Sequence, residues 1–366
     1  MDYNPIIHRI KTPVEMLNIV GVGGLHLNTI VECWGNPQSG KSTFSYQTGG
    51  MYLEQFGDDA ELLILDAESS IDISRLRHAY NIRPCNIKGV RNPDSRVSVQ
   101  PGFTLESGET EILKKVKEIK KDNRSLLVIW DSISATMPKT EFEDILKAME
   151  NEDESNPYAG GMMLKARVLK RTLNSLMLNT WQLPVTIILI NQATTSIGRY
   201  HSKETSGGGY GLKHNRHYGI RFNFQKKFGE DGYFAEGTLT HLTLEKSKFS
   251  PNLFDIPVYI RDNLGGVIDP IEEIITVAFN MGIIVQRGGW YRLGEEAMKR
   301  FNDDETVKEY FPCRWAKLKT ILGLPTFIRA QIETLFRSNY KLVDFAYQDR
   351  DEELKLIQGE ETDDTS

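Results

Sequence analysis

Residues 31–43 of this 366-residue chain read VECWGNPQSGKST. A short apolar stretch ending in Trp34 leads into the pattern G-x-x-x-x-G-K-[ST], and the following segment, TFSYQTGGMYLEQF, has the character of a helix. Glycines in this pattern let the backbone curl until successive N–H groups point at an anion, and the positive end of the helix dipole faces the same anion. The stretch therefore predicts a phosphate-binding loop between a strand and a helix, in an α/β nucleotide-binding domain.

The residue types of the loop suit a nucleoside triphosphate. Lys41 is expected to reach the β- and γ-phosphates, and the Ser42 hydroxyl to hold Mg²⁺. A glycine-rich turn with no ligand is the alternative, but the position between a strand and a helix disfavours it. The predicted nucleotide-binding residues of the loop are Gly35, Asn36, Pro37, Gln38, Ser39, Gly40, Lys41, Ser42 and Thr43.

Composition limits the class of protein. Forty per cent of the residues are apolar and 26% are charged, which is ordinary for a globular chain, and the longest apolar runs, such as 185–190, are too short to span a bilayer. The N-terminus lacks the apolar core of a targeting signal, and three widely spaced cysteines indicate neither a disulfide framework nor a zinc site. We therefore expect a cytoplasmic protein with no membrane partner.

The formal net charge of −6 is located in the last eighteen residues. Residues 349–366 carry eight acids and two bases, so the rest of the chain is formally neutral. Global charge therefore does not argue against a local basic surface. The tail is either a solvated, disordered end or a regulatory segment, and the residues leave both open.

Strand and helix patterns alternate after the phosphate loop, which predicts a mainly parallel, doubly wound sheet. Three apolar runs end in polar side chains: Asp66-Ala67-Glu68, Asp131 and Asn191-Gln192. Ligands of such sheets bind beyond the carboxyl ends of the strands, so these side chains are expected at the nucleotide site. Asp131 suits a carboxylate of the Mg²⁺ shell.

Other segments frame this core. Residues 4–10 predict a short strand with no partner of its own, and residues 111–122 an amphipathic helix. Residues 135–160 are a polar, acidic insertion, and residues 193–217 form a second long loop without apolar periodicity. The expected parts are an N-terminal oligomerisation segment (1–13), a core (14–268) with loops at about 135–162 and 193–217, a C-terminal domain (269–348) and the acidic tail (349–366).

The ordered motifs resemble the RecA family of recombinases, nearest to the UvsX-type recombinases of phages. The likeness runs from about residue 14 to residue 295. A single phosphate loop is common to many NTPases, whereas the ordered set is specific. The resemblance implies a RecA-like P-loop ATPase core with a short N-terminal segment and a small α+β C-terminal domain. The motifs are VEMLNIVGVGGLHLNTIVECWGNPQSGKST, LLILDAESSID, LLVIWDSISA, IILINQ, SGGGYG, LEKSKF and GGWY.

The resemblance implies catalytic roles for Lys41 and four further residues. Glu68 would orient and deprotonate the attacking water. Gln192 would sense the γ-phosphate, and it matches bacterial RecA, since UvsX-type chains can carry His there. Lys246 and Lys248 match a pair that reaches the neighbouring subunit's ATP, where they would neutralise charge as an arginine finger does. On the residues alone, a helix-capping Glu68, a strand-end polar Gln192 and two exposed strand-end lysines stay open as alternatives.

The resemblance also assigns residues 193–217 to a DNA-binding loop. Dispersed cations there suit phosphates, glycines allow close approach, and Tyr200, Tyr210 and His214 offer rings for stacking on bases. A flexible surface loop is the alternative. The first loop is acidic, so its candidate is Arg167 in the helix that follows. The expected DNA-binding residues are Arg167, Arg199, Lys203, Gly207, Gly208, Gly209, Lys213 and Arg216.

Two departures from the family affect assembly and base recognition. Only about a dozen residues precede the core, where bacterial RecA has a longer segment for polymerisation. If residues 5–10 add to a neighbour's sheet edge, with Ile6 or Ile7 in a pocket, assembly is preserved. Arg75 stands where family members place a tyrosine against adenine, and a guanidinium can also stack on a base.

The implied protein is a DNA-dependent ATPase that uses ATP and Mg²⁺ at subunit interfaces of a helical filament. It would form that filament on single-stranded DNA, pair it with double-stranded DNA and exchange strands in recombination and repair. Single-strand-binding and mediator proteins are its candidate partners. Two other functions stay open at this point. One is a hexameric DNA helicase with the same core, and the other is a non-catalytic, ATP-responsive recombination mediator.

Overall fold

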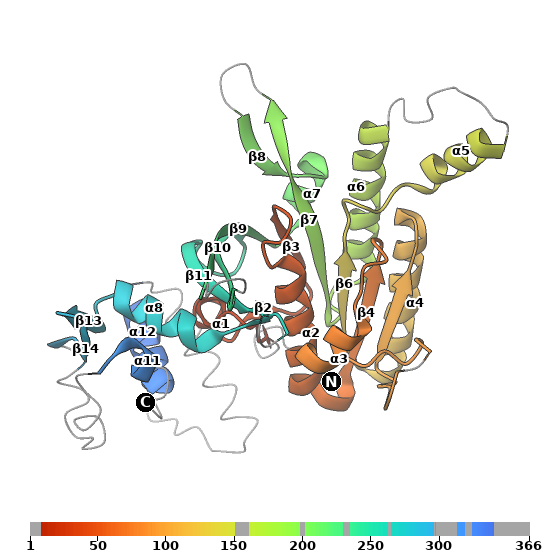
Figure 1. The fold of residues 1–366 in the computed structure, drawn as a ribbon. Coiled ribbons are helices and arrows are strands. Elements are labelled where there is room, and N and C mark those ends of the chain that lie inside the picture. The colour runs from red at the N-terminus through yellow and green to blue at the C-terminus, as the bar shows by residue number, and fades with distance from the viewer. Residues whose placement is uncertain are drawn as a thin grey trace, which may run out of the picture.

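The computed structural model describes residues 9–88, 90–150, 161–197, 202–229, 235–262, 265–295, 297, 313–318 and 324–339. Its centre is one large twisted sheet (Figure 1). The strands of this sheet are β3 (Ile30–Gly35), β4 (Ala60–Asp66), β5 (Val97–Pro101), β6 (Ser125–Asp131), β7 (Val185–Ile197), β8 (Ser202–Ser206), β9 (Tyr218–Phe228), β10 (Gly237–Ser247), β11 (Leu253–Arg261) and β12 (Val267–Ile268).

The strand order confirms the predicted mainly parallel, doubly wound sheet. Along the sheet it is β12-β11-β10-β9-β3-β7-β6-β4-β5, with β8 paired to β7. The strands from β9 to β5 are parallel, whereas β10, β11 and β12 continue from β9 as antiparallel neighbours. All seven residues of β4 and of β6 are buried, because helices cover both faces of the parallel part.

Alternate side chains of the central strands enter two different cores. Leu62 and Ile64 of β4 pack with α2 (Lys41–Phe56) and α3 (Ile73–Tyr80) on one face. Leu63 and Leu65 pack with α4 (Leu105–Asp122) and α6 (Gly161–Asn179) on the other. Figure 1 shows these helix pairs on opposite sides of the sheet. The period of two along a strand therefore fixes which helices cover which face.

Helix α4 begins earlier than residue 111, where the amphipathic pattern starts. Its N-cap is Thr104, whose hydroxyl accepts a hydrogen bond from the backbone N–H of Ser107 at 3.3 Å. The Ser107 hydroxyl in turn accepts one from the backbone N–H of Thr104 at 2.9 Å. This reciprocal capping satisfies two N–H groups at the helix start, so the polar turn before the apolar pattern becomes helical.

Three segments differ from the expected irregular or unpaired structure. Strand β1 (Arg9–Ile10) pairs antiparallel with β2 (Leu25–His26), so the expected absence of a partner is wrong for these residues. The first insertion contains α5 (Lys139–Glu150). Residues 193–197 of β7 pair antiparallel with β8, which we call the hairpin, and α7 (Gly209–Asn215) follows; residues 198–201 lie outside the described residues. Residues 1–8 and 151–160 lie outside the described residues.

The C-terminal elements share a core with the start of the chain. They are α8 (Pro270–Asn280), the hairpin of β13 (Ile284–Arg287) and β14 (Trp290–Leu293), α11 (Trp315–Leu318) and α12 (Leu324–Asn339). Ile275 of α8 and Ile332 of α12 are buried in the same cluster as Ile19 of α1 (Glu15–Val20). The buried carboxylate of Glu273 accepts hydrogen bonds from the first N–H groups of α1, which fixes that helix.

Two expectations about domain organisation are not tested by the described residues. The boundary at residue 269 between core and C-terminal domain stays a prediction, and the acidic tail, 349–366, lies outside the described residues. Within the described part of the chain, no helix has the length and apolar character needed to cross a bilayer.

Candidate nucleotide site and adjoining hairpin

Strand register brings the predicted nucleotide residues to one edge of the sheet. Gly35 at the end of β3 pairs with Gln192 on β7, and Asp66 at the end of β4 pairs with Asp131 at the end of β6. The backbone N–H of Ala67 donates to the carbonyl oxygen of Asp131 at 2.8 Å, which ties the two strand ends together. The carboxyl edge thus gathers the phosphate loop with the acids and the amide that follow the neighbouring strands.

Two positions of the phosphate loop require glycine. Gly35 has φ +153°, and a Cβ there would lie 2.0 Å from the carbonyl oxygen of Phe222 on β9. Gly40 has φ +92°, and its Cβ would lie 2.3 Å from Cδ1 of Ile260 on β11. Any side chain at Gly35 would push the loop off the sheet, and one at Gly40 would strain the start of α2.

Lys41, the first residue of α2, is almost fully buried inside the loop. Its Nζ donates to the carbonyl oxygens of Gly35 at 3.0 Å and Asn36 at 2.6 Å. Burial lowers the pKa of Lys41, and the nearby carboxylate of Asp131 is the largest influence in the opposite direction. The ammonium group therefore lies among carbonyl dipoles where a phosphate oxygen would be a stronger partner.

Asp131 is the buried acid at the end of β6. Its Oδ2 accepts a hydrogen bond from the Tyr46 hydroxyl at 2.9 Å. Burial raises the pKa of Asp131, while hydrogen bonds from Tyr46 and Ser42 lower it. Tyr46 was not among the predicted site residues, although it lies one helical turn after Ser42 and so shares its face of α2.

The donor set of this edge fits Mg²⁺ bound together with a nucleotide. Ser42 and Asp131, the two predicted metal residues, offer hard oxygen ligands. Among the described residues, no group of three or more His, Cys, Asp or Glu side chains could hold a metal alone. That agrees with the usual binding of Mg²⁺ by one or two protein oxygens plus substrate phosphates and water.

Glu68 and Gln192, which are predicted to activate the attacking water and to sense the γ-phosphate, both have exposed side chains. Oε1 of Glu68 accepts a hydrogen bond from the Ser132 hydroxyl at 2.6 Å, just past the end of β6. The backbone of Gln192 is bonded to the hairpin, because its carbonyl oxygen accepts from the N–H of Gly207 at 3.3 Å. Both lie at the edge where they were expected, and their chemical roles stay predictions.

A cavity of about 440 Å³ opens beside the phosphate loop. One of its walls is Arg75, whose guanidinium donates to the carbonyl oxygens of Gly265 at 3.0 Å and Gly266 at 3.3 Å and to the Thr43 hydroxyl at 3.2 Å. Arg75 is therefore held against the loop by three acceptors. The lining residues are Gln38, Ser39, Gly40, Lys41, Ser42, Thr43, Arg75, Lys227, Thr238, Ile260 and Asp262.

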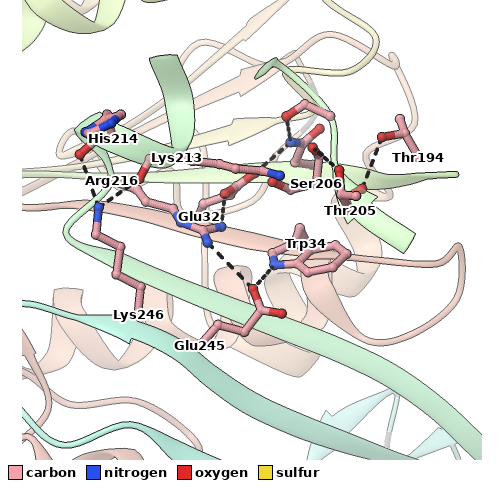
Figure 2. A network of polar contacts seen from close by, with 12 residues as sticks. Glu32, Trp34, Thr194, Thr205, Ser206, Lys213, His214, Arg216, Glu245 and Lys246 are labelled. Atoms are coloured by element: carbon pink, nitrogen blue, oxygen red, sulfur yellow. Dashed lines mark hydrogen bonds and ion pairs between the residues drawn. The ribbon is translucent and has the colours of Figure 1, made fainter. Parts of the chain in front are cut away.

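The lysine pair lies at the end of β10, near α7. Lys246 Nζ donates to the carbonyl oxygens of Lys213 at 2.8 Å and His214 at 3.1 Å, which belong to the last turn of α7 (Figure 2). Burial lowers the pKa of Lys246, and the charge of Lys248 lowers it further. Neither lysine is among the residues that line the cavity beside the phosphate loop of its own subunit.

A buried ion pair holds both ends of the segment between β7 and β9. The carboxylate of Glu32 on β3 pairs with Arg216 (Figure 2). Its Oε1 also accepts a hydrogen bond from Asn191 Nδ2 at 2.7 Å. The same Asn191 nitrogen donates to the carbonyl oxygen of Gly207 at 2.9 Å. Arg216 also lies 3.6 Å from a carboxylate oxygen of Glu245. Burial raises the pKa of Glu32, and the charge of Arg216 is the main opposing influence.

This ion pair changes the interpretation of one predicted DNA residue. Arg216 is 7% exposed, so its guanidinium faces Glu32 and not the surface in this conformation. Sequence reasoning also missed Glu32. The signal was present, since an acid inside the apolar strand VECW needs a buried partner.

The other DNA candidates are distributed over the hairpin, α7 and α6. Tyr210 is 84% exposed at the start of α7, with its ring centroid 6.4 Å from that of His214. Gly207 and Gly208 form the bend before α7, Gly209 is the first residue of α7, and Arg167 is exposed on α6. Figure 1 shows the hairpin projecting beyond the body of the sheet. Arg199, Tyr200 and the side chain of Lys203 lie outside the described residues.

Comparison with known proteins gives a consistent result. The profile of the RecA N-terminal domain family matches residues 6–256. A protein RecA of Malacoplasma penetrans is 30% identical over 297 residues, covering 80% of both chains. A protein RecA of Desulforapulum autotrophicum is 27% identical over 83% of this chain and 80% of its own. A plasmid-encoded protein RecA of Lactococcus lactis is 26% identical over 77% of this chain and 72% of its own.

Proposed function

This chain belongs to the RecA family of recombinases, and from that premise we propose that it is an ATP-dependent DNA recombinase. It binds single-stranded DNA as a helical filament, hydrolyses ATP when DNA is bound, and pairs the filament with homologous double-stranded DNA for strand exchange. The proposed setting is recombination and repair of DNA in the bacterial cytoplasm. The proposed partners are single-strand-binding and mediator proteins. The nearer likeness to UvsX-type phage recombinases stays a prediction from the sequence.

One observation carries this proposal: the hairpin and the nucleotide edge are built on the same strand. β7 runs without interruption from the buried sheet through Gln192, beside the phosphate loop, into the hairpin with β8. Asn191 joins the hairpin to the strand that leads into the loop. A nucleotide that contacts Gln192 would therefore change the position of the hairpin, and with it the glycines and cations of residues 193–217.

The residues at the carboxyl edge of the sheet have different roles in ATP hydrolysis. Lys41 binds the β- and γ-phosphates, and the N–H groups of the loop orient them. Ser42 and Asp131 would hold Mg²⁺, which neutralises charge on the phosphates when bound. Glu68 orients and deprotonates the attacking water, since its carboxylate is exposed at the edge beside Asp131.

The site becomes complete at a contact between subunits. Lys246 and Lys248 of one subunit reach the nucleotide held by the phosphate loop of the next, where two cations stabilise charge on the transferring phosphoryl group. Two observations support this arrangement: Lys246 of β10 is bonded to the last turn of α7, and it is not among the residues that line the cavity beside the loop of its own subunit. Residues 1–13 are the proposed oligomerisation segment.

DNA binding is assigned to the hairpin, α7 and the neighbouring face of α6. Tyr210 and His214 offer exposed rings for stacking on bases. Arg167, Lys203, Lys213 and Arg199 supply cations for phosphates, and the glycines at 207–209 allow the backbone to approach.

Two measurements test the proposal. ATP hydrolysis is measured with and without single-stranded DNA, and the expected result is strong stimulation. The protein is then imaged by negative stain with an ATP analogue and single-stranded DNA, where helical filaments are expected. Hydrolysis that DNA does not stimulate, or closed rings and isolated particles in the images, would overturn the assignment.

A further inference from the structure

The phosphate loop and the hairpin touch each other directly at one point. Nδ2 of Asn36, the second residue of the loop, donates to Oε1 of Glu204 on β8 at 3.1 Å. The other carboxylate oxygen of Glu204 accepts from Arg221 of β9 at 2.8 Å. Glu204 thus receives a hydrogen bond from the nucleotide-binding loop on one side and an ion pair from the sheet on the other.

Arg221 is a fixed anchor for this carboxylate. Its guanidinium lies 5.1 Å from the ring centroid of Trp34, a buried residue of β3. The indole N–H of Trp34 donates to a carboxylate oxygen of Glu245 at 3.0 Å (Figure 2). Stacking on an aromatic face and pairing with a carboxylate both restrain a guanidinium. The less constrained side of Glu204 is therefore its contact with Asn36.

Asn36 also takes part in holding the loop's cation. Its backbone oxygen accepts from Lys41 Nζ at 2.6 Å and from the Ser39 hydroxyl at 2.8 Å. A phosphate that competes for Lys41 Nζ would remove one of these donors from the Asn36 carbonyl. The Asn36 carbonyl then keeps only the Ser39 hydroxyl as a donor, so the backbone of Asn36 is less restrained and can turn together with its side chain.

We propose that Glu204 is a positioning residue, which through Asn36 makes the position of the hairpin depend on phosphate binding at Lys41. While Lys41 holds the Asn36 carbonyl, Asn36 and Arg221 together hold Glu204 and the hairpin against the body of the protein. Phosphate binding at Lys41 releases Asn36, and the hairpin moves to its DNA-binding position. The inference deepens the proposed function and rests on it.

The contact can be removed without unfolding the chain. The side chains of Arg221 and Glu204 are 33% and 40% exposed, and ion pairs with that exposure contribute little to stability. Glu204→Ala removes the contact altogether, whereas Glu204→Gln keeps an oxygen that can accept from Asn36. Asn36→Ala removes it from the other side, and the double variant completes a cycle.

The readout is the affinity for a dye-labelled single-stranded oligonucleotide, measured by fluorescence anisotropy with and without a non-hydrolysable ATP analogue. In wild type the analogue tightens binding. We expect Glu204→Ala to reduce this tightening by about fivefold, the equivalent of one ordinary hydrogen bond. Asn36→Ala should do the same, and the double variant should lose no more than either single one. Glu204→Gln should retain most of the tightening.

Two further measurements distinguish a positioning role of Glu204 from general damage to the nucleotide site or to the hairpin. The affinity of Glu204→Ala for a fluorescent ATP analogue without DNA should stay within about twofold of wild type, since Glu204 is not among the residues lining the cavity beside the loop. Thr194→Val removes a hydrogen bond inside the hairpin, from the Thr194 hydroxyl to the carbonyl oxygen of Thr205 at 3.1 Å, and should leave the tightening unchanged.

The outcomes that overturn the inference are distinct from those that overturn the proposed function. If wild type binds DNA more tightly with the analogue but Glu204→Ala does so equally, the inference alone fails. Additive losses in the double variant, or an equal loss in Thr194→Val, also reject it. If the analogue does not change the affinity of wild type for DNA, the proposed function fails with it.

Discussion

Arg216→Ala tests whether the buried ion pair organises the segment between β7 and β9. The change leaves the carboxylate of Glu32, which is fully buried, with a hydrogen bond from Asn191 but without the charge of Arg216. Removing one partner of a buried pair costs about 3–5 kcal/mol of unfolding free energy, because the other charge is left uncompensated. We expect that loss at pH 7.5.

The loss should depend on pH with a definite sign. Burial already holds the folded-state pKa of Glu32 above its unfolded value, and removing Arg216 raises that pKa further. A raised pKa contributes stability that is complete below the unfolded pKa and lost as pH rises through the folded pKa. The gap between wild type and Arg216→Ala should therefore widen with rising pH, by at most about 1.4 kcal/mol per pH unit for one group.

Urea unfolding at pH 5.5, 6.5 and 7.5 measures the gap. Replacing Glu32 by Gln in the Arg216→Ala background removes both charges and should recover part of the stability at pH 7.5. Lys114→Ala, in a pair with Glu111 that is largely exposed on α4, is the matched control and should cost about 0–1 kcal/mol at every pH. A gap that is the same at all three values, or below about 1 kcal/mol at pH 7.5, would refute the reasoning.

Three further predictions concern the nucleotide edge and α1. Lys41→Ala should abolish the nucleotide-dependent gain in DNA affinity, measured by fluorescence anisotropy. Mixing Glu68→Ala subunits with Lys246→Ala/Lys248→Ala subunits should partly restore ATP hydrolysis, and no recovery at any ratio would mean that the lysines act within their own subunit. Burial raises the pKa of Glu273 to about 8, so its stabilising contribution is lost as pH rises from its unfolded value towards 8. Glu273→Gln does not titrate, and its melting temperature should therefore rise relative to wild type between pH 6 and pH 8.

Local patterns were enough to predict the arrangement of the central sheet. The apolar runs of β4, β6 and β7 are continuous because helices cover both faces, and each ends in an acid or an amide. Parallel strands place those ends at one edge, so the sequence alone is enough to assign Asp66, Asp131 and Gln192 to that edge.

Contacts between distant segments were not predictable in the same way. Glu204 appeared in the sequence as one acid among several cations, and nothing local indicates that it meets Asn36 and Arg221. The hairpin itself was missed because β8 is polar, so it lacks the alternation by which a half-buried strand is recognised. Arg216 has the charge expected of a DNA-binding residue, but it is buried as an ion-pair partner. Only the fold distinguishes these two roles.

The continuity of β7 has a mechanical consequence. Thirteen residues of extended chain reach about 43 Å, with the inner half clamped between two strands and the outer half carrying the hairpin. Such an element is stiff along its length. Tension on a polynucleotide bound to the outer half would therefore be transmitted directly to the central sheet, because within the described residues of β7 no flexible linker separates the hairpin from that sheet.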